Sequence, residues 1–457
     1  MDDTIAAVST AMAPAGIGIV RVSGREARII TDRIFRAKKE GKRLINVKSH
    51  TIHYGWIVDH EEIIDEVLVM VMKGPRTYTG EDTVEIDCHG GVLAVKKVLE
   101  AVLHAGARAA QPGEFTKRAF LSGRMDLSQA EAVMDVISAK NAYALKSSES
   151  QLRGTVKRAI REIRESLIYE IAFIESALDD PEHISLDGYP KRLGEVVREQ
   201  KQKVEKLLAS ADEGKMIQEG IKTVILGKPN AGKSSLLNLL VGEEKAIVTE
   251  IAGTTRDVLE EHLVLKGISL RILDTAGIRK TTDKVEKIGV DRAMEHAKDA
   301  DLILYVVDVS VPLDENDQKI IDLIQRKNSI VLMNKSDLTA VIDKEKMEQL
   351  VKAPVLSISA REETGIEQLE DTIRKLFFRG EISFNDEVYI TNARHKQALA
   401  EAKKSLELVE NSIAMGMPED FFSIDLMSAY EQLGEIIGES AGEDLVNEIF
   451  SKFCTGK

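Results

Sequence analysis

The sequence predicts an α+β N-terminal domain, an all-α central domain formed by two sequence segments, and an α/β domain inserted between those segments. Three observations lead to this prediction. Apolar residues alternate with polar ones through much of residues 1–118. They recur at helical spacing both before and after residues 219–380. Within 219–380, a phosphate-binding loop follows an apolar run. The expected boundaries are 1–118, 119–218, 219–380 and 381–457, with the second and fourth ranges forming one helical domain.

The N-terminal segment has the pattern of a sheet with a hairpin. Alternating residues predict strands at Ile17–Val22, His50–Val58, Ile63–Met72 and Thr83–Cys88, and a helix follows at Val92–Ala105. The hairpin turns around Asp59–Glu62. Cys88 alternates with Val84 and Ile86, so we expect its thiol to lie in the core.

Helical patterns occupy Glu114 to Gly214 and then residues 391–453. Ser128–Glu131 fits a capping box, which marks a helix start. Because each helical set has an amphipathic face that must be buried, we expect the two sets to form one domain around the insertion. One apolar stripe comprises Ile160, Ile163, Leu167, Ile171 and Ile174.

The phosphate-binding loop is Gly227–Ser234, GKPNAGKS, which follows the apolar strand Ile221–Leu226 and leads into a helix. Its glycines permit a tight turn whose amides face phosphates. Lys233 can reach the β- and γ-phosphates, and the Ser234 hydroxyl can bind Mg²⁺. The dipole of the helix that follows adds partial positive charge at the same point.

Two further motifs concern the phosphates and the base. Asp274–Gly277, DTAG, ends a second apolar strand, and an Asp there lies in the outer coordination shell of Mg²⁺. Asn334–Asp337, NKSD, closes a third strand. The Asp337 carboxylate can accept hydrogen bonds from both N1–H and N2–H of guanine, and against adenine it would stay unpaired. The order of these motifs predicts a Ras-like P-loop GTPase domain.

Ser359 and Ala360 follow a fourth strand and resemble the loop that supports a guanine ring. The residues expected to bind GTP are therefore Asn230, Ala231, Gly232, Lys233, Ser234, Ser235, Thr249, Glu250, Ile251, Ala252, Gly253, Thr254, Thr255, Asp274, Thr275, Ala276, Gly277, Asn334, Lys335, Asp337, Ser359, Ala360 and Arg361.

The catalytic segment differs from that of Ras-type enzymes, which place a water-orienting Gln directly after the D-x-x-G glycine. Here that position is Ile278, which cannot hold a water. Glu286 is the first carboxylate after Asp283 in the same polar segment. It either orients the attacking water or is a solvated helix charge. One hydroxyl of the pair Thr254 and Thr255 is expected to complete the Mg²⁺ shell.

Asn230 is a second unusual feature, because its amide oxygen would lie beside the α- and β-phosphates. With nearby Thr and backbone oxygens it can hold a monovalent cation, where an arginine finger otherwise places its charge. The alternative is that Asn230 serves only the geometry of the loop.

The composition bounds the class of protein. A chain of 457 residues implies two to four domains. No run of 18 apolar residues predicts a membrane span, and the N-terminus lacks a basic signal-peptide region. Two cysteines, Cys88 and Cys454, fit a reduced, cytoplasmic location. The net charge of −14 argues against broad non-specific nucleic-acid binding, although a local basic face remains compatible with it.

Several segments together resemble the tRNA-modification GTPase family known as MnmE or TrmE over the full length. They are GIGIVRVSG (Gly16–Gly24), YTGEDTVEIDCHGG (Tyr78–Gly91), PGEFTKRAFLSGRMDLSQAEA (Pro112–Ala132), GKPNAGKSS, TEIAGTTRD, and the tail FCTGK, similar to the family's Cys-x-Gly-Lys. Three details depart from the family pattern. Arg124 replaces a frequent Lys, Thr455 replaces the usual Ile, and Asp180–His183, DPEH, stands where the family has a more acidic FPEE run.

The resemblance implies a function that the motifs alone do not. Family members use GTP hydrolysis, stimulated by K⁺-dependent pairing of two G domains, while adding an aminomethyl or carboxymethylaminomethyl group to carbon 5 of the wobble uridine of certain tRNAs. A tetrahydrofolate derivative, 5-formyl- or methylene-tetrahydrofolate, supplies the one-carbon unit. The implied partners are a second copy of the chain, a flavin-containing MnmG/GidA-like protein that carries the FAD in a heterotetramer or larger complex, and tRNA, with no membrane.

The resemblance also implies residue roles. It assigns K⁺ to Asn230, Thr249, Thr254 and the backbone of Ile251, Mg²⁺ to Ser234 and Thr255, and catalysis to Glu286. Folate is assigned to Arg21, Glu81, Arg124 and Lys457, and Cys454 is either near the folate or a packed thiol. A carboxylate such as Glu81 can pair with the amide-like edge of a pterin, and the cations can meet carbonyls or the glutamate tail.

Two other classes of GTPase share parts of this pattern. Ribosome-assembly GTPases have the P-loop Asn and the Ile after the D-x-x-G glycine, but typically append a basic RNA-binding domain with a GXXG loop. No such appendage is evident here, and the chain is acidic. A pure signalling switch would not need the two large flanking domains.

Overall fold

The computed structural model describes residues 3–243, 261–265, 267–273, 295–378 and 388–456. The chain forms two compact units. The first unit comprises residues 1–134, 151–186 and 418–457, and the second comprises residues 135–150 and 187–417. Among the described residues, no helix is long and apolar enough to cross a bilayer.

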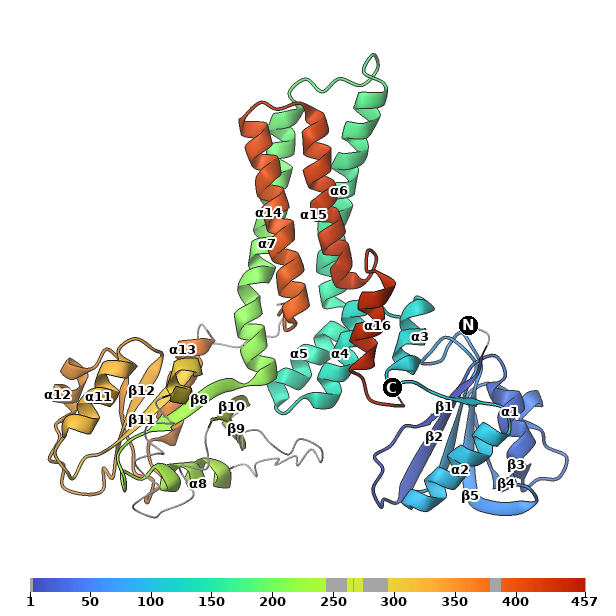
Figure 1. Ribbon diagram of the computed structural model, residues 1–457, viewed down its shortest axis with the longest axis horizontal. Coiled ribbons are helices and arrows are strands. Elements are labelled where there is room, and N and C mark those ends of the chain that lie inside the picture. The colour runs from blue at the N-terminus through green and yellow to red at the C-terminus, as the bar shows by residue number, and fades with distance from the viewer. Residues whose placement is uncertain (1–2, 244–260, 266, 274–294, 379–387, 457) are drawn as a thin grey trace. The chain divides into compact units, whose positions relative to one another are not determined.

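The first unit contains a seven-stranded sheet in the order β3-β4-β5-β6-β2-β1-β7. Helices α1 and α2 pack on one face of it and close an apolar core with the strands (Figure 1). The elements are β1 (Ile5–Val8), β2 (Ile17–Ser23), α1 (Ala27–Ile34), β3 (Phe35–Ala37), the 3₁₀ turn η1 (Leu44–Asn46), β4 (Thr51–Asp59), β5 (Glu62–Met72), β6 (Thr83–His89), α2 (Val92–His104) and β7 (Arg108–Ala109).

The predicted hairpin is confirmed. Strands β4 and β5 are antiparallel, and Asp59 pairs with Glu62 across a two-residue turn. His60 and Glu61 form that turn with φ values of 44° and 69°, the left-handed conformation that a two-residue hairpin turn requires. The predicted strands at β2 and β6 are also present, and Cys88 is buried in the core as expected.

Helices α3 (Glu114–Leu121), α4 (Leu127–Ser138), α6 (Thr155–Asp179), α15 (Glu419–Ile437) and α16 (Glu443–Ser451) lie wholly or largely in the first unit. Helix α6 packs along α15 (Figure 1). The apolar stripe predicted for α6 is buried throughout: Ile160, Ile163, Leu167, Ile171 and Ile174.

The predicted capping box at Ser128 is wrong by two residues. Helix α4 begins at Leu127. Asp126 caps it, because Asp126 Oδ1 accepts from the Gln129 amide (3.0 Å) while Gln129 Oε1 accepts from the Asp126 amide (3.1 Å). Ser128 lies inside the helix and donates its hydroxyl to Asp126.

The second unit contains a six-stranded sheet, β13-β12-β11-β8-β10-β9, in which every neighbouring pair is parallel except β10 with β9. Its elements are β8 (Ile221–Leu226), α8 (Lys233–Glu243), β9 (Glu261–Leu265), β10 (Ile268–Ile272), β11 (Leu302–Asp308), α11 (Glu315–Ile324), β12 (Ser329–Asn334), α12 (Lys344–Leu350), β13 (Val355–Ser357) and α13 (Ile366–Phe377). Because parallel strands share a carboxyl edge, the loops after β8, β12 and β13 open on one side.

Helices α5 (Ala142–Leu152), α7 (Tyr189–Glu219) and α14 (Ala393–Ala414) lie wholly or largely in the second unit. Helix α7 packs along α14. At Gly214 of α7 the segment before α14 comes close, because a Cβ atom there would lie 2.4 Å from the Ile390 carbonyl oxygen. Both helix pairs, α6 with α15 and α7 with α14, combine one helix from each side of the inserted domain. Within each unit, helices from the two sequence segments therefore pack together, and the bounds of a single helical domain stay a prediction.

Candidate functional site

The phosphate-binding loop joins β8 to α8, and its two glycines are fixed by their surroundings. Gly227 has φ 152°, and a Cβ atom there would lie 2.4 Å from the Val306 carbonyl oxygen. Gly232 has φ 99°, and its Cβ would lie 2.0 Å from Asn334 Nδ2. Between them Asn230 is left-handed, with φ 59°. The loop thus has no room for side chains at its glycines, so its backbone can lie close to a phosphate.

Lys233 spans this loop. Its ammonium donates to the carbonyl oxygens of Gly227 and Lys228, each at 2.7 Å. Lys233 and Ser234 occupy the first turn of α8, where the helix dipole favours anions. The two side chains assigned to phosphate and Mg²⁺ therefore start from the same helix end.

Asn334 connects the loop to the base-binding segments. It is buried at the end of β12, where its Nδ2 donates to the Ala231 carbonyl (2.8 Å). Its Oδ1 accepts from the Ala360 amide (3.1 Å). One side chain thus holds the phosphate-binding loop and the loop after β13 together, and it does so with both ends of its amide satisfied.

Asp337 faces outward from the same segment. The Ser359 hydroxyl donates to Asp337 Oδ1 (2.6 Å), and this hydrogen bond, assisted by the charges of Arg361 and Lys335, lowers the carboxyl pKa despite some desolvation. An ionised carboxylate is an acceptor only, which suits the paired N–H donors of guanine. Lys335 is left-handed (φ 62°) and its ammonium pairs with Asp308 at the end of β11.

The remaining predicted nucleotide residues lie outside the described residues. They are Thr249, Glu250, Ile251, Ala252, Gly253, Thr254, Thr255, Asp274, Thr275, Ala276 and Gly277. Ile278 and the catalytic candidate Glu286 lie outside them as well. Their roles stay predictions.

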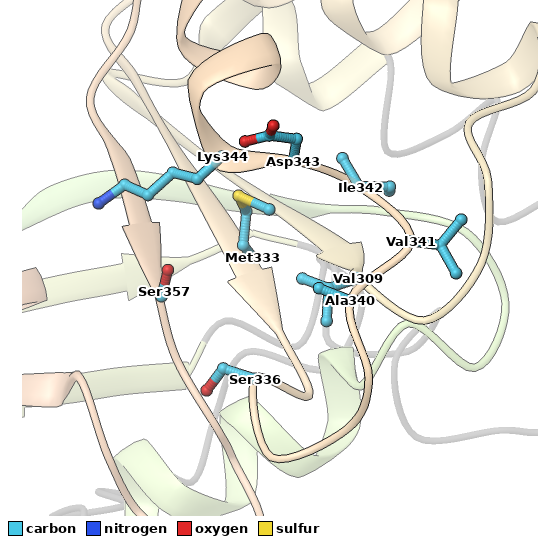
Figure 2. Close-up of a pocket in the computed structure, with 9 residues that line it drawn as sticks. All are labelled: Val309, Met333, Ser336, Ala340, Val341, Ile342, Asp343, Lys344 and Ser357. Carbon is cyan, nitrogen blue, oxygen red and sulfur yellow. The ribbon is translucent and has the colours of Figure 1, made fainter.

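A separate pocket of about 510 Å³ lies on the second unit near the ends of β11, β12 and β13 (Figure 2). Val309, Met333, Ile342 and Ser357 line it together with Ser336, the variable residue of the NKSD motif. Asn334, Lys335 and Asp337 do not line it. The pocket is therefore distinct from the predicted guanine site.

A second candidate site lies in the first unit, around Tyr78. The guanidinium of Arg21 lies 5.3 Å from the centre of the Tyr78 ring, and that of Arg124 lies 4.9 Å from it. Arg124 also donates to the Tyr78 carbonyl (2.9 Å), and Arg21 donates to Glu85 (2.7 Å). Two residues predicted to bind folate, far apart in sequence, therefore meet at one half-buried aromatic ring.

Glu81, three residues beyond Tyr78, is held by a residue that sequence reasoning missed. Arg118 is buried, with a side chain 2% exposed, and donates to both Glu81 oxygens (3.2 and 3.1 Å). The Ser23 hydroxyl donates to Glu81 Oε2 (2.9 Å). Within the described part of the chain, the Arg118 Nε has no hydrogen-bond partner. Arg118 thus binds Glu81 from the buried side, while the Glu81 carboxylate itself remains partly exposed to solvent.

Arg118 also pairs with Asp3 and with Glu114, one helical turn away. Burial alone would raise the pKa of Glu114, but hydrogen bonds from Arg108, the Gln111 amide and Arg118 outweigh it, so this pKa lies below its usual value. The i, i+4 spacing of Glu114 and Arg118 was the available sequence signal, but it is equally typical of solvated helix surfaces.

The C-terminal tail docks against the same region. The Gly456 carbonyl accepts from the Ser9 hydroxyl (3.2 Å) and from Arg21 (3.4 Å). Gly456 has φ 98°, and a Cβ there would lie 2.2 Å from the Val8 carbonyl oxygen. Lys457 lies outside the described residues, but the residue before it contacts Arg21. Cys454 is exposed, and its carbonyl accepts from the Gly113 amide.

Among the described residues one group has the composition of a metal site: Asp59, His60 and His104. It lies on the surface, at the β4–β5 turn and the end of α2, and contains none of the residues predicted to bind Mg²⁺ or K⁺. His104 Nδ1 and Asp59 Oδ2 are hydrogen-bonded at 2.9 Å.

Comparison with known proteins covers nearly the whole chain. The family model described as GTP-binding protein TrmE N-terminus matches residues 4–124, and the model described as MnmE helical domain matches residues 127–454. The chain is 60% identical over 455 residues to the tRNA modification GTPase MnmE of Lachnoclostridium phytofermentans, covering 100% of this chain and 99% of the relative. It is 50% identical over 458 residues to that of Thermoanaerobacter pseudethanolicus, covering 100% and 99%.

Among solved structures, the G domain of the T. maritima FeoB iron transporter is 28% identical and covers 34% of this chain and 97% of that chain, with a TM-score of 0.26. The fold, with its phosphate-binding loop, defines a P-loop GTPase. Along the sequence, an α+β domain comes first, and the Ras-like domain is inserted into the helical domain that follows it. With full-length identity at this level, the chain belongs to the tRNA modification GTPase MnmE family.

Proposed function

We propose that this chain hydrolyses GTP as part of tRNA modification, and that GTP binds at the carboxyl edge of the second unit's sheet. The observation that carries the site is Asn334, which ties the phosphate-binding loop to the loop after β13. This contact supports a site in which one scaffold holds both the phosphate end and the base end of a nucleotide. Asp337, ionised and exposed beside Ser359, supplies the selectivity for guanine.

The chain's own groups have distinct tasks in hydrolysis. Lys233 and the amides of the phosphate-binding loop hold the β- and γ-phosphates, and Ser234 and Thr255 hold Mg²⁺. When bound, Mg²⁺ neutralises charge that develops on the phosphates. Glu286 orients the attacking water, because Ile278 cannot. The oxygens of Asn230, Thr249, Ile251 and Thr254 hold K⁺ against the same developing charge.

Base selectivity offers a direct test of the site. Asp337→Asn replaces one of the two acceptor oxygens for the N1–H and N2–H of guanine with an N–H donor, so GTP affinity should fall at least about tenfold while affinity for xanthosine triphosphate rises. Asp322→Asn, which alters an exposed carboxylate on α11, is the matched control and should leave both affinities unchanged. An unaltered GTP preference in Asp337→Asn would place guanine recognition elsewhere.

We further propose that the site around Tyr78 binds a tetrahydrofolate derivative that supplies the one-carbon unit for the wobble uridine. Glu81 offers paired acceptors to a pterin edge, and Arg21, Arg124 and Lys457 offer cations to the folate's carbonyls and glutamate tail. Cys454 is exposed near this region and remains a candidate for contact with the folate. A flavin-containing MnmG/GidA-like partner would supply the FAD, and tRNA would be the shared substrate in the cytoplasm.

A homodimer through the N-terminal domains is part of the proposal. It is supported by the face of the sheet opposite α1 and α2, where Ile52, Tyr54 and Leu68 are 59%, 40% and 44% exposed. Tyr54 and Leu68 are direct cross-strand partners, so the apolar surface is continuous. Two G domains held on one dimer would meet at a high effective concentration, and their K⁺-dependent pairing would then need little intrinsic affinity.

Two measurements test this larger function. Mass analysis of wobble uridine in cells lacking this protein should show loss of the aminomethyl-type group at carbon 5. Titration of the purified chain with 5-formyltetrahydrofolate should show saturable binding that Glu81→Gln weakens, since a neutral amide accepts less strongly and adds a donor. A ribosome-assembly GTPase would show neither result.

A further inference from the structure

One segment of the first unit is strongly basic in an otherwise acidic chain. Residues 25–48 contain nine Arg or Lys and three Asp or Glu, a net charge of +6, whereas the whole chain has a net charge of −14. The segment runs from α1 through β3 and η1 to the start of β4. A concentration of one charge sign of this size creates a local field opposite to that of the whole molecule.

The segment is held in a fixed shape by one buried carboxylate. Asp32 on α1 accepts from the Leu44 amide and pairs with Arg43, and Arg28 donates to the Ile45 carbonyl (3.0 Å). The loop from β3 to η1 is thereby fastened along α1. Its tip is a turn in which the Lys42 amide donates to the Lys39 carbonyl (3.3 Å).

Most of the cations on this surface have no acidic partner within the described part of the chain. Asp32 is paired with Arg43, and Glu40 forms no ion pair with any described residue. The exposed cations for which the described residues provide no ion pair are Arg25, Arg33, Arg36, Lys38, Lys39, Lys42 and Lys48. We call this set the α1–β3 basic surface.

Protection of a sheet edge explains only part of it. Strand β3 is the edge strand, and charges on an edge strand discourage pairing with another sheet. Arg36 lies on that strand, and Lys38 continues it with its ammonium 5.1 Å from the Tyr54 ring centre. Arg25 precedes α1, however, and Lys42 and Lys48 lie outside the strands, so edge protection does not account for them.

We propose that the α1–β3 basic surface binds the phosphate backbone of tRNA. This inference rests on the proposed function, which makes tRNA the substrate, and adds where the tRNA is held. Guanidinium groups suit phosphate oxygens because their N–H donors form a fork, and lysines add charge without demanding one geometry. Phosphate contacts position an RNA without reading its sequence, so one surface can serve several tRNAs.

The test uses the full-length chain and an unmodified, fluorescently labelled tRNA transcript, with affinity measured by anisotropy between 50 and 200 mM KCl. The variant Arg36→Ala/Lys39→Ala/Lys42→Ala should weaken binding about tenfold or more at low salt. It should also reduce the slope of log affinity against log salt by about 2 to 3. Each phosphate contact releases counterions from the RNA when it forms, and the variant lacks three of these contacts.

Two further variants make the result specific. Arg326→Ala/Lys346→Ala/Lys352→Ala removes the same charge from exposed positions of the second unit that form no ion pair with the described residues. This variant should bind tRNA like the parent chain. Arg36→Lys/Lys39→Arg/Lys42→Arg keeps the charge and should restore most of the affinity. GTP turnover should be the same in all variants. Arg36 is the cross-strand partner of Trp56 on the strand that bears Tyr54, so a smaller mass by light scattering in the first variant, with tRNA affinity unaltered, would assign Arg36 to the proposed dimer face instead.

The outcomes separate the two proposals. If the parent chain binds no tRNA, the proposed function loses its substrate. If the parent binds tRNA and the first variant binds equally well with the same salt slope, the surface is not the tRNA site, although the function stands. Aggregation of that variant with unaltered tRNA affinity would show edge protection instead. Vesicles of anionic lipid serve as a second probe. If the parent binds them, and the first variant loses that binding while keeping its tRNA affinity, the surface would be assigned to a membrane.

Discussion

The contact between Asn334 and Gly232 allows a sharp test of how the GTP site is built. Asn334→Ala removes two hydrogen bonds, to the Ala231 carbonyl and from the Ala360 amide, from a side chain that is 2% exposed. Each bond contributes about 1 kcal/mol net, and the buried groups left behind cost about 1 to 3 kcal/mol each. We expect GTP affinity to fall roughly 30-fold or more, since about 1.4 kcal/mol corresponds to a factor of ten.

Gly232→Ala perturbs the same contact from the other side. The new Cβ would lie 2.0 Å from Asn334 Nδ2, and a residue with a side chain is strained at φ 99°. In the double variant the amide is gone, so the steric conflict disappears and only the backbone strain, about 1 to 3 kcal/mol, remains. The combined loss should therefore be smaller than the sum of the single losses by about 1 to 2 kcal/mol.

The assay is titration of each variant with a fluorescent GDP analogue at fixed Mg²⁺, with thermal unfolding as a check that the chain is folded. Gly194→Ala on α7 is the control, because its nearest neighbour, Ile413 Cδ1, would be 3.9 Å from the new Cβ, an ordinary contact. Strict additivity of the two losses, or unchanged affinity in Asn334→Ala, would refute the role assigned to this side chain.

The remaining predictions concern catalysis, the folate site and stability. GTP turnover should be much faster in K⁺ than in Na⁺, and Asn230→Ala should remove that difference. Glu286→Ala should lower kcat roughly 100-fold or more with little change in nucleotide affinity, because no other group is assigned to orient the water. Deleting Phe453–Lys457 should weaken formyltetrahydrofolate binding and leave GTP hydrolysis largely intact. Arg118→Met should destabilise the first unit by about 3 to 5 kcal/mol near pH 7. Because the folded-state pKa of Glu114 lies below its ordinary value of 4.5, that carboxylate's contribution is present above pH 4.5 and is lost as pH falls through the lowered value, so the gap between variant and parent should narrow in acid.

Each of these predictions has a result that would contradict it. Equal turnover in the two salts would remove the cation site, and near-parental turnover in Glu286→Ala would direct attention to Asp283. Unchanged folate affinity after the deletion would exclude the tail from the site. A stability gap for Arg118→Met that stays the same from pH 7 to well below the lowered pKa of Glu114 would show that its carboxylate partners do not carry the loss.

Local patterns were sufficient wherever the structure depends on neighbours in sequence. The strand Ile221–Leu226 was predicted with its observed bounds, and the β4–β5 hairpin with its turn, because alternation and turn length are local properties. The capping box shows the limit of such patterns. Asp126 and Ser128 each begin a plausible box, and the choice depends on Leu127, which is fully buried at the first helical position. Burial of one residue sets the helix start, and the pattern does not contain that information.

The spacing of residues along the sequence could not reveal contacts between distant segments. Arg118 looks like half of a solvated helix pair. Only the packing of α3 against the segment before β1, which bears Asp3, and against the loop that bears Glu81 makes Arg118 a buried counter-ion. The Gly456 carbonyl likewise meets Arg21 across 435 residues of chain. Because residues from both ends of the chain form the site around Tyr78, and the loops of the second unit form the GTP site, changes to the tail should act on folate binding and leave the affinity for GTP unaltered.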